Sequence, residues 1–132
     1  MSTPIARHDV LLVACLCAEW CGTCRDYRAT LSQALSGFDP ARLSIAWIDI
    51  EDHDEVLGAI DVQDFPTVLI ARADQVLFFG TVTPHAQTLT RLVQGALDGG
   101  LSAQPPDADA HALAARIRAL QLAVSGVFTG RW

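Results

Sequence analysis

Residues 10–24 have the sequence VLLVACLCAEWCGTC, in which an uninterrupted apolar run leads directly into a Cys-x-x-Cys motif. Continuous apolar runs of this length are typical of strands that are buried on both faces of a sheet. The residues after the motif predict a helix over Cys21–Leu35, because Tyr27, Leu31 and Leu35 recur at helical spacing. The motif is therefore expected where a buried strand gives way to a helix.

All four cysteines of the chain fall within residues 15–24. Cys15 and Cys17 are two positions apart on the expected strand, so their side chains should point to the same face. Unpaired N–H groups and the helix dipole favour a thiolate at a helix N-terminus, which would make Cys21 an attacking nucleophile. Cys24 lies one helical turn further on, close enough to form a disulfide and release a bound partner.

Three interpretations of this cysteine cluster stay open on the residues alone. The first is a redox pair of Cys21 and Cys24, with Cys15 and Cys17 as buried small hydrophobic residues. The second is a metal site, although two pairs on a strand and a helix would have to distort to bind one ion; a soft-metal site using one pair is harder to exclude. The third is a structural disulfide, which a domain of this size does not need. The spacing favours the redox pair and predicts no metal ligands.

Composition narrows the class of protein further. The chain has 132 residues, of which 51% are hydrophobic, as expected for one ordinary globular domain. All nine basic residues are arginines and they do not cluster, so we expect no nucleic-acid partner. No apolar stretch approaches the roughly 20 residues of a membrane span, and the apolar run before Cys15 is too short for a signal peptide. The expected location is cytoplasmic, where thiols stay reduced.

Further elements follow the motif along the chain. Apolar runs predict strands, and periodic segments predict helices: strands over Leu43–Ile50, Val68–Ala71 and Val76–Gly80, a short helix that ends near Ile60, and helices from about residue 83 to Asp98 and over Asp107–Val124. Up to Asp98 the order is strand–helix–strand–helix–strand–strand–helix. This order combines one right-handed parallel crossover with one hairpin, and it predicts an α/β fold.

Three short segments resemble the thioredoxin family. Residues 18–25 (AEWCGTCR) resemble its active-site motif, with Thr23 where the family usually has proline. Phe65-Pro66-Thr67 resembles its cis-proline loop, and Phe79-Gly80-Thr81 resembles its glycine turn after the last strand. The resemblance covers roughly residues 10–99. It implies a thioredoxin-like α/β fold, with flanking helices on a mixed central sheet, that lacks the N-terminal strand and helix and carries an extra C-terminal helix.

The resemblance also implies an activity, namely thiol–disulfide exchange on protein substrates by a protein-disulfide reductase. Cys21 and Cys24 would be the catalytic residues: Cys21 attacks the substrate disulfide and Cys24 resolves the mixed disulfide. The substrate-binding residues implied are Trp20, Gly22, Thr23, Phe65, Pro66 and Gly80. No bound cofactor is implied, and the partners would be protein disulfides and an electron-donating reductase or small thiol.

The sequence departs from the family at the buried positions behind the motif. Cys15 stands where the family has a buried aspartate, Trp47 where it has a partner lysine, and Cys17 where it has an aromatic residue. A drier, less charged environment should raise the pKa of Cys24 and slow the resolution of mixed disulfides. Cys15, Cys17 and Glu19 are therefore candidate modulators of the redox pair.

The C-terminal region is the other departure from the family. We divide the chain into a thioredoxin-like domain over residues 1–100 and a linker with a C-terminal amphipathic helix over residues 101–132. Without a preceding strand, Leu43–Ile50 is expected at a sheet edge, covered by this helix or by a homodimer contact. The added tail keeps a second function open, a thioredoxin-like adaptor or chaperone-like binding module with a non-catalytic Cys-x-x-Cys; a soft-metal carrier is a third.

Overall fold

The apolar run before the cysteine motif forms an inner strand of a mixed sheet. The computed structural model describes residues 10–18, 22–58, 60, 62, 66–73, 75–100 and 108–123. Within these residues one four-stranded sheet has the order β2-β1-β3-β4. β1 and β2 are parallel, whereas β1 with β3 and β3 with β4 are antiparallel. The strands are β1 (Leu11–Cys17), β2 (Leu43–Asp49), β3 (Thr67–Arg72) and β4 (Gln75–Thr81).

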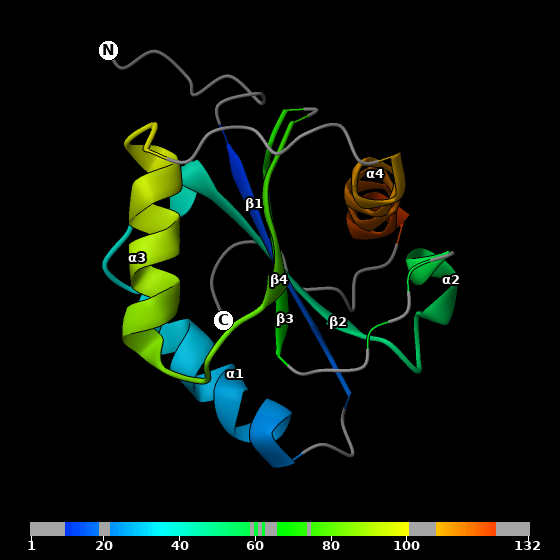
Figure 1. Cartoon of the computed structure of the whole chain (residues 1–132), viewed down its shortest axis with the longest axis horizontal. Helices are drawn as coiled ribbons and strands as arrows, with labels where there is room; N and C mark the ends of the chain where they lie inside the picture. The colour runs from blue at the N-terminus through cyan, green and yellow to red at the C-terminus, as the bar shows by residue number, and fades with distance from the viewer. Residues whose placement is uncertain are drawn as a thin grey trace.

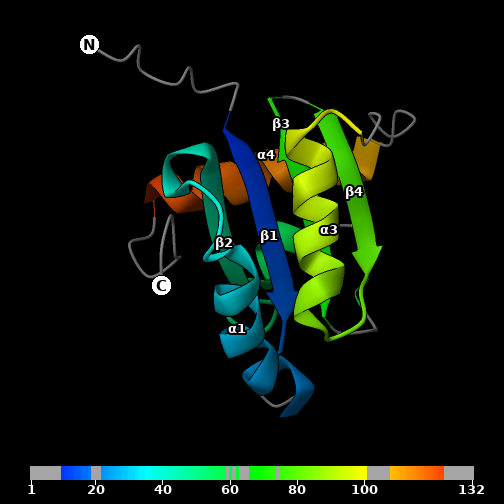
Figure 2. The ribbon, with the colours of Figure 1, turned by 90° about the vertical axis from the view of Figure 1, so that its left-hand side faces the viewer.

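Helices cover both faces of this sheet (Figures 1 and 2). α1 and α3 lie on one face, and α2 and α4 lie on the other. The helices are α1 (Gly22–Leu35), α2 (Asp54–Leu57), α3 (Ala86–Leu97) and α4 (Ala108–Ala123), with a short 3-10 turn, η2, over Pro40–Arg42. The predicted α/β class and the predicted element order are confirmed, and most predicted strand and helix ends lie within about two residues of the observed ones, as is usual for such boundaries.

The alternation of side chains along β1 divides the interior into two cores. All seven residues of β1 are buried because both faces of the strand are covered. Leu11, Val13, Cys15 and Cys17 face α1 and α3 and form the first core with the inner side chains of those helices. The residues between them face α4 and α2 and form the second core; they are Leu12, Ala14 and Leu16.

The C-terminal helix is part of the second core. Leu113 and Ile117, predicted to share one face of the helix, are fully buried, and Leu120 is nearly so. Val124, predicted on the same face, lies outside the described residues. β2 is an edge strand of the sheet, as predicted. However, α4 covers the face of the sheet rather than this edge, because its apolar stripe packs against side chains that point away from the sheet plane.

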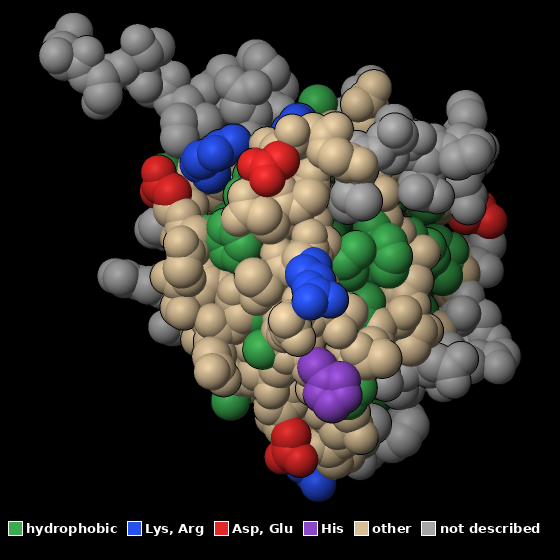
Figure 3. Space-filling model, turned by 60° about the vertical axis from the view of Figure 1, so that its left-hand side comes forward, with side chains coloured by type: hydrophobic (Ala, Val, Ile, Leu, Met, Phe, Trp, Pro, Cys, Tyr) green, Lys and Arg blue, Asp and Glu red, His purple; other side chains and the backbone are tan. Residues whose placement is uncertain are grey.

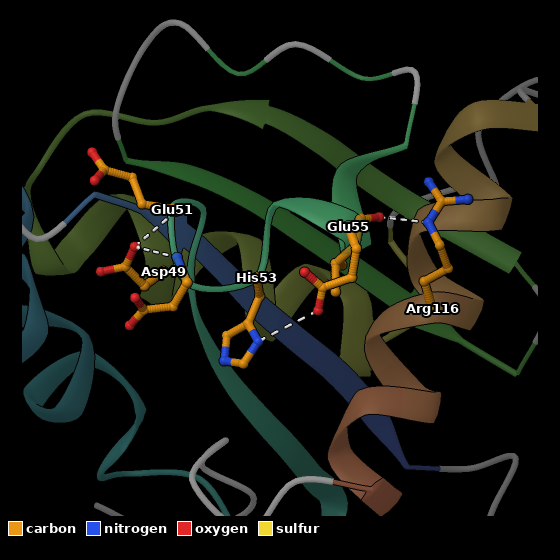
Figure 4. Close-up of polar contacts among 7 residues, drawn as sticks. Asp49, Glu51, His53, Glu55 and Arg116 are labelled. Carbon is orange, nitrogen blue, oxygen red and sulfur yellow. Dashed lines mark hydrogen bonds and ion pairs between the residues drawn. The ribbon is translucent and has the colours of Figure 1, made fainter.

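Two side chains of α4 reach the ends of neighbouring elements. The guanidinium of Arg116 donates to the carbonyl oxygen of Val56 (Figure 4) and also to that of Leu57, both at the C-terminal end of α2. The amide of Gln121 donates to the Ser44 hydroxyl on β2 at 3.1 Å. These contacts join α4 to both elements of the β2–α2 segment.

The outer surface is mixed in character. Figure 3 shows the molecule turned toward its α1 and α3 side, where charged side chains are scattered singly or in small groups between hydrophobic patches. α3 is amphipathic, with Leu89, Val93 and Ala96 buried and the residues of its outer side exposed, among them Gln87, Arg91 and Gln94. No helix among the described ranges is both long enough and apolar enough to span a membrane.

Candidate functional site

One end of the sheet brings together the segments that the sequence analysis singled out. β1 ends at Cys17, and α1 begins five residues later at Gly22. The start of β3 lies beside the end of β1, because Thr67 is paired with Leu16. The Val82 N–H donates to the Pro66 carbonyl at 3.0 Å, which holds the end of β4 against the residue before β3. The N-terminus of α1, Pro66 and the ends of β1 and β4 are therefore neighbours.

A disulfide joins the end of β1 to the first turn of α1. It links Cys17 and Cys24, whose Cα atoms are 5.7 Å apart, a separation typical of disulfides. Each cysteine is only 1% exposed, and both belong to the core between the sheet and α1. Cys24 faces inward because it lies on the same side of α1 as Tyr27 and Leu31, which are also buried. The sequence analysis did not identify Cys17 as the partner of Cys24, although it did place Cys17 on a buried face.

Cys15 completes this group of three buried sulfurs. Its thiol is free, and its Sγ lies 3.7 Å from the Sγ of Cys17, which confirms that the two side chains share a face of β1. Burial raises the pKa of the Cys15 thiol well above its ordinary value. Cys15 is therefore protonated at neutral pH, a poor nucleophile but a competent donor to a neighbouring sulfur.

The groups around the sulfurs are apolar or aromatic. Burial raises the pKa of the Tyr27 hydroxyl, and a negative charge on Cys15 would raise it further. Within the described residues that hydroxyl has no hydrogen-bond partner. Trp47 lies opposite Cys15 on β2, and the guanidinium carbon of Arg28 lies 5.7 Å from the centre of its ring. Trp47, the position at which the resemblance implied a lysine, is thus an aromatic ring with an arginine side chain over it.

The entrance to α1 is exposed. Gly22 and Thr23, predicted to contact substrate, are both exposed on the first turn, whereas the next residue, Cys24, is buried. A Cβ added at Gly22 would meet only the end of the Arg25 side chain, at 3.8 Å. The N–H groups of a first helical turn have no partners within the helix, so this exposed turn can offer hydrogen-bond donors.

Several predicted site residues lie outside the described part of the chain. They are Glu19, Trp20, Cys21 and Phe65. The pairing of Cys21 with Cys24 and the cis form of the bond before Pro66 stay predictions. Pro66 itself is buried beside the sheet end. Gly80 lies within β4 opposite Val68, as the predicted strand over Val76–Gly80 has it, and not in the turn that the family resemblance implied.

An acidic turn follows β2 next to this sheet end. The Ile50 N–H donates to the Cys17 carbonyl at 2.9 Å, which attaches the start of the turn to the end of β1. Asp49 accepts from the N–H groups of Glu51 and Asp52, and His53 lies 3.7 Å from the Glu55 carboxylate (Figure 4). These carboxylates and the imidazole mainly order their own turn. Among the side chains that the structure describes, no group of three or more His, Cys, Asp or Glu residues is arranged to hold a metal ion.

Comparisons with known proteins agree with this architecture. The family model described as Thioredoxin matches residues 2–94. A search of the curated proteins found no match. The structure is similar to thioredoxin from Trypanosoma brucei brucei, with 24% identity, a TM-score of 0.59, and coverage of 70% of this chain and 79% of that one. It is also similar to the germline-specific thioredoxin Deadhead from Drosophila melanogaster (22% identity, TM-score 0.57, 65% and 80% covered) and to oxidised thioredoxin from Plasmodium falciparum (15%, 0.56, 69% and 85%). At these identities the solved structures establish a shared fold.

Proposed function

Because the chain belongs to the thioredoxin family, we propose that it is a thiol–disulfide oxidoreductase that reduces disulfides in other proteins. The observation that carries this proposal is the state of Cys24. Its sulfur lies in the first turn of α1 and is itself part of a disulfide, so it is placed for disulfide chemistry and not only for packing. The Cys-x-x-Cys motif supplies a second sulfur three positions earlier.

The proposed reaction has two exchange steps. The Cys21 thiolate attacks one sulfur of the substrate disulfide, forms a mixed disulfide and releases the other sulfur as a thiolate. The Cys24 thiolate then attacks the Cys21 sulfur, forms the Cys21–Cys24 disulfide and releases the second substrate thiolate. The two electrons taken up by the substrate come from the two protein thiols, so no bound cofactor is needed. A reductase or a small thiol then restores the dithiol.

The surroundings of the sheet end support a platform for an extended substrate chain. Gly22 and Thr23 are exposed at the helix entrance, and Pro66 lies at the same end of the sheet. A proline there has no N–H, so it leaves no unpaired donor beside the reacting sulfurs. We propose that Trp20 and Phe65 complete the platform. We also place the protein in the cytoplasm, where a reductant for Cys21 and Cys24 is available.

Reduction of insulin disulfides tests this function. With dithiothreitol as the electron donor, the wild-type chain should accelerate the precipitation of free insulin B chains. Cys21→Ser should return the rate to that of dithiothreitol alone, because the attacking thiolate is lost. Cys15→Ser is the matched control, since Cys15 is buried and unbonded, and it should keep the wild-type rate. A wild-type chain without activity, or an active Cys21→Ser chain, would contradict the proposal.

The Cys17–Cys24 disulfide also supports a second candidate function. If this bond persisted in the cytoplasm, Cys24 would be unable to resolve mixed disulfides, and the motif would be non-catalytic. The chain would then act as a binding module built on the thioredoxin fold. A wild-type chain that keeps the Cys17–Cys24 bond in millimolar-range dithiothreitol and leaves the insulin rate unchanged would favour this second function.

A further inference from the structure

Cys24 has two candidate disulfide partners, and its sulfur can bond to only one at a time. The family motif pairs it with Cys21, which precedes it by three positions. The structure pairs it with Cys17, seven positions earlier, across the junction between β1 and α1. Both arrangements contain one disulfide, so they are isomers at the same oxidation level. Conversion of one into the other requires no oxidant or reductant.

We propose that Cys17 is a third redox-active thiol, which takes over the disulfide from the Cys21–Cys24 pair after a substrate has been reduced. This step rests on the proposed function. The Cys17 thiolate attacks the Cys24 sulfur, the Cys17–Cys24 bond forms, and the Cys21–Cys24 bond breaks. Cys21 leaves as a thiolate, and the proton lost by Cys17 is released to solvent or taken up by Cys21. One disulfide is present before and after the step.

Contacts in the structure select Cys17 rather than Cys15 for this step. Cys17 is the residue whose Cα lies 5.7 Å from that of Cys24, and it is bonded to it. Cys15 is unbonded and lies one strand pleat further from the end of β1. Because burial keeps the Cys15 thiol protonated, it is suited to donate an S–H hydrogen bond to Cys17, 3.7 Å away, when the disulfide opens.

The transfer gives the oxidised protein an unusual property. In a plain Cys21–Cys24 disulfide both motif sulfurs are blocked. After transfer, the disulfide lies in the core between two residues that are each 1% exposed, and Cys21 is again a thiol. The oxidised chain should therefore still react with a second disulfide through Cys21, and it should hold that partner as a mixed disulfide, because Cys24 is occupied.

The positions of Glu19 and Arg25 allow the two disulfides to be distinguished. The reduced full-length chain is treated with one equivalent of oxidised glutathione, quenched in acid, denatured, and labelled with N-ethylmaleimide. Trypsin together with a glutamate-specific protease then releases residues 8–19, which contain Cys15 and Cys17, and residues 20–25, which contain Cys21 and Cys24. A Cys17–Cys24 bond links these two fragments, whereas a Cys21–Cys24 bond stays within the second.

We expect the linked fragments to be the main product once exchange has reached equilibrium, with the maleimide on Cys15 and Cys21. Cys17→Ser should lose the linked product and accumulate fragment 20–25 with its internal disulfide. Cys15→Ser, the matched control on the same strand, should keep the link. Fragment 8–19 labelled at both cysteines in the wild type would overturn the proposal without any need for a variant. Loss of the link in Cys15→Ser but not in Cys17→Ser would also overturn it.

A rate measurement tests whether Cys21 is the residue that first reacts with the substrate disulfide. With a protein disulfide such as insulin as the oxidant, Cys21→Ser should form the Cys17–Cys24 link at least about ten-fold more slowly, because a large substrate cannot reach two buried sulfurs. Equal rates would overturn the transfer step. If the wild type reduces insulin but never gives linked fragments, the proposed function stands and this inference fails. If linked fragments form equally fast with and without Cys21, and the wild type does not accelerate the reduction of insulin by dithiothreitol, both fail.

Discussion

The two faces of the sheet are both closed by helices, but with different kinds of side chain. The face under α1 and α3 contains the three buried sulfurs and the hydroxyl of Tyr27. Among the described residues, the fully buried side chains under α4 and α2 are aliphatic, with the partly buried Phe79 packed against them; they include Leu12, Leu16, Ile48, Leu69 and Ile117. β1 contributes alternate residues to each face. The same strand therefore contributes sulfur to one core and hydrocarbon to the other, and the two cores can be changed separately by mutation.

The largest expected loss of stability comes from a mutation in the aliphatic core under α4 and α2. Ile117 is completely buried between α4 and the sheet, so Ile117→Ala removes buried methyl groups and leaves a cavity. We expect the free energy of unfolding to fall by about 2–5 kcal/mol, measured by urea denaturation. The pairing of the cysteines in the remaining native protein should be unchanged, because they belong to the other core.

The exposed side of the same helix provides the control. Ala119 lies on α4 with its side chain exposed, and Ala119→Gln should alter stability by no more than about 0.5 kcal/mol. If Ile117→Ala were equally mild, α4 would be a loosely attached arm and the second core would not depend on it. If Ile117→Ala changed which cysteines are paired, the two faces would not be independent.

The next prediction concerns the pH dependence of stability that the buried Cys15 thiol should cause. In the reduced protein the folded state holds the Cys15 proton tightly, whereas the unfolded chain releases it above its ordinary pKa of about 8.5. The stabilisation from Cys15 is therefore complete below that pH and declines as pH rises, by up to about 1.4 kcal/mol per pH unit. Unfolding of wild type and Cys15→Ala, compared at pH 8, 9 and 10 under reducing conditions, should show the difference between them shrinking, by less from pH 8 to 9 than from pH 9 to 10. A constant difference would mean that Cys15 is not held as a buried thiol.

A smaller effect is expected where α4 contacts α2. Arg116→Met keeps the apolar stem but removes the donors to the carbonyls of Val56 and Leu57. We expect a loss of about 1–2 kcal/mol, because hydrogen bonds from a charged donor are stronger than average and these groups are half-buried. Amide hydrogen exchange at Val56 should become faster. Arg91→Met, at an exposed position of α3, is the control and should leave both measurements unchanged. Unchanged exchange in Arg116→Met would show that α2 does not depend on α4.

The smallest predicted change in stability is an increase and not a loss. The Tyr27 hydroxyl is buried without a hydrogen-bond partner among the described residues, so Tyr27→Phe removes an unsatisfied polar group. We expect the protein to become more stable by about 1 kcal/mol in thermal or urea unfolding. Thr90→Val offers a contrast on the same face, because the Thr90 hydroxyl donates to the carbonyls of Ala34 and Ala86, and its removal should destabilise. Destabilisation by Tyr27→Phe would indicate that the hydroxyl has a partner after all.

The sequence pattern was sufficient for the elements and for the faces of single elements. Apolar runs located the strands, the i, i+4 spacing of Tyr27 and Leu31 identified the buried side of α1, and the two-residue spacing placed Cys15 and Cys17 together. These features are local, so periodicity determines them. The thioredoxin family and its α/β fold were also predicted, from the cysteine motif and the Phe-Pro-Thr segment.

Features that depend on how elements meet were not predictable in this way. The amphipathic stripe of α4 shows that the helix buries one side, but not that it lies on a sheet face rather than along the edge of β2. The spacing of Cys17 and Cys24 does not reveal that the first turn of α1 passes over the end of β1. Each of these outcomes is set by packing between segments distant from each other.

The position of α4 in chain order has a consequence for biosynthesis. All four strands leave the ribosome before α4 does, and so do α1 and α3, the helices that cover the three buried sulfurs. Until α4 emerges, Leu12, Leu16, Ile48 and Leu69 belong to an uncovered apolar sheet face. Since translation adds roughly 5–20 residues per second, the nascent chain exposes this apolar surface for a second or more. A chain released after residue 100 would thus present a substrate for chaperones, because α1 and α3 can close one face of the sheet while the opposite face lacks α4.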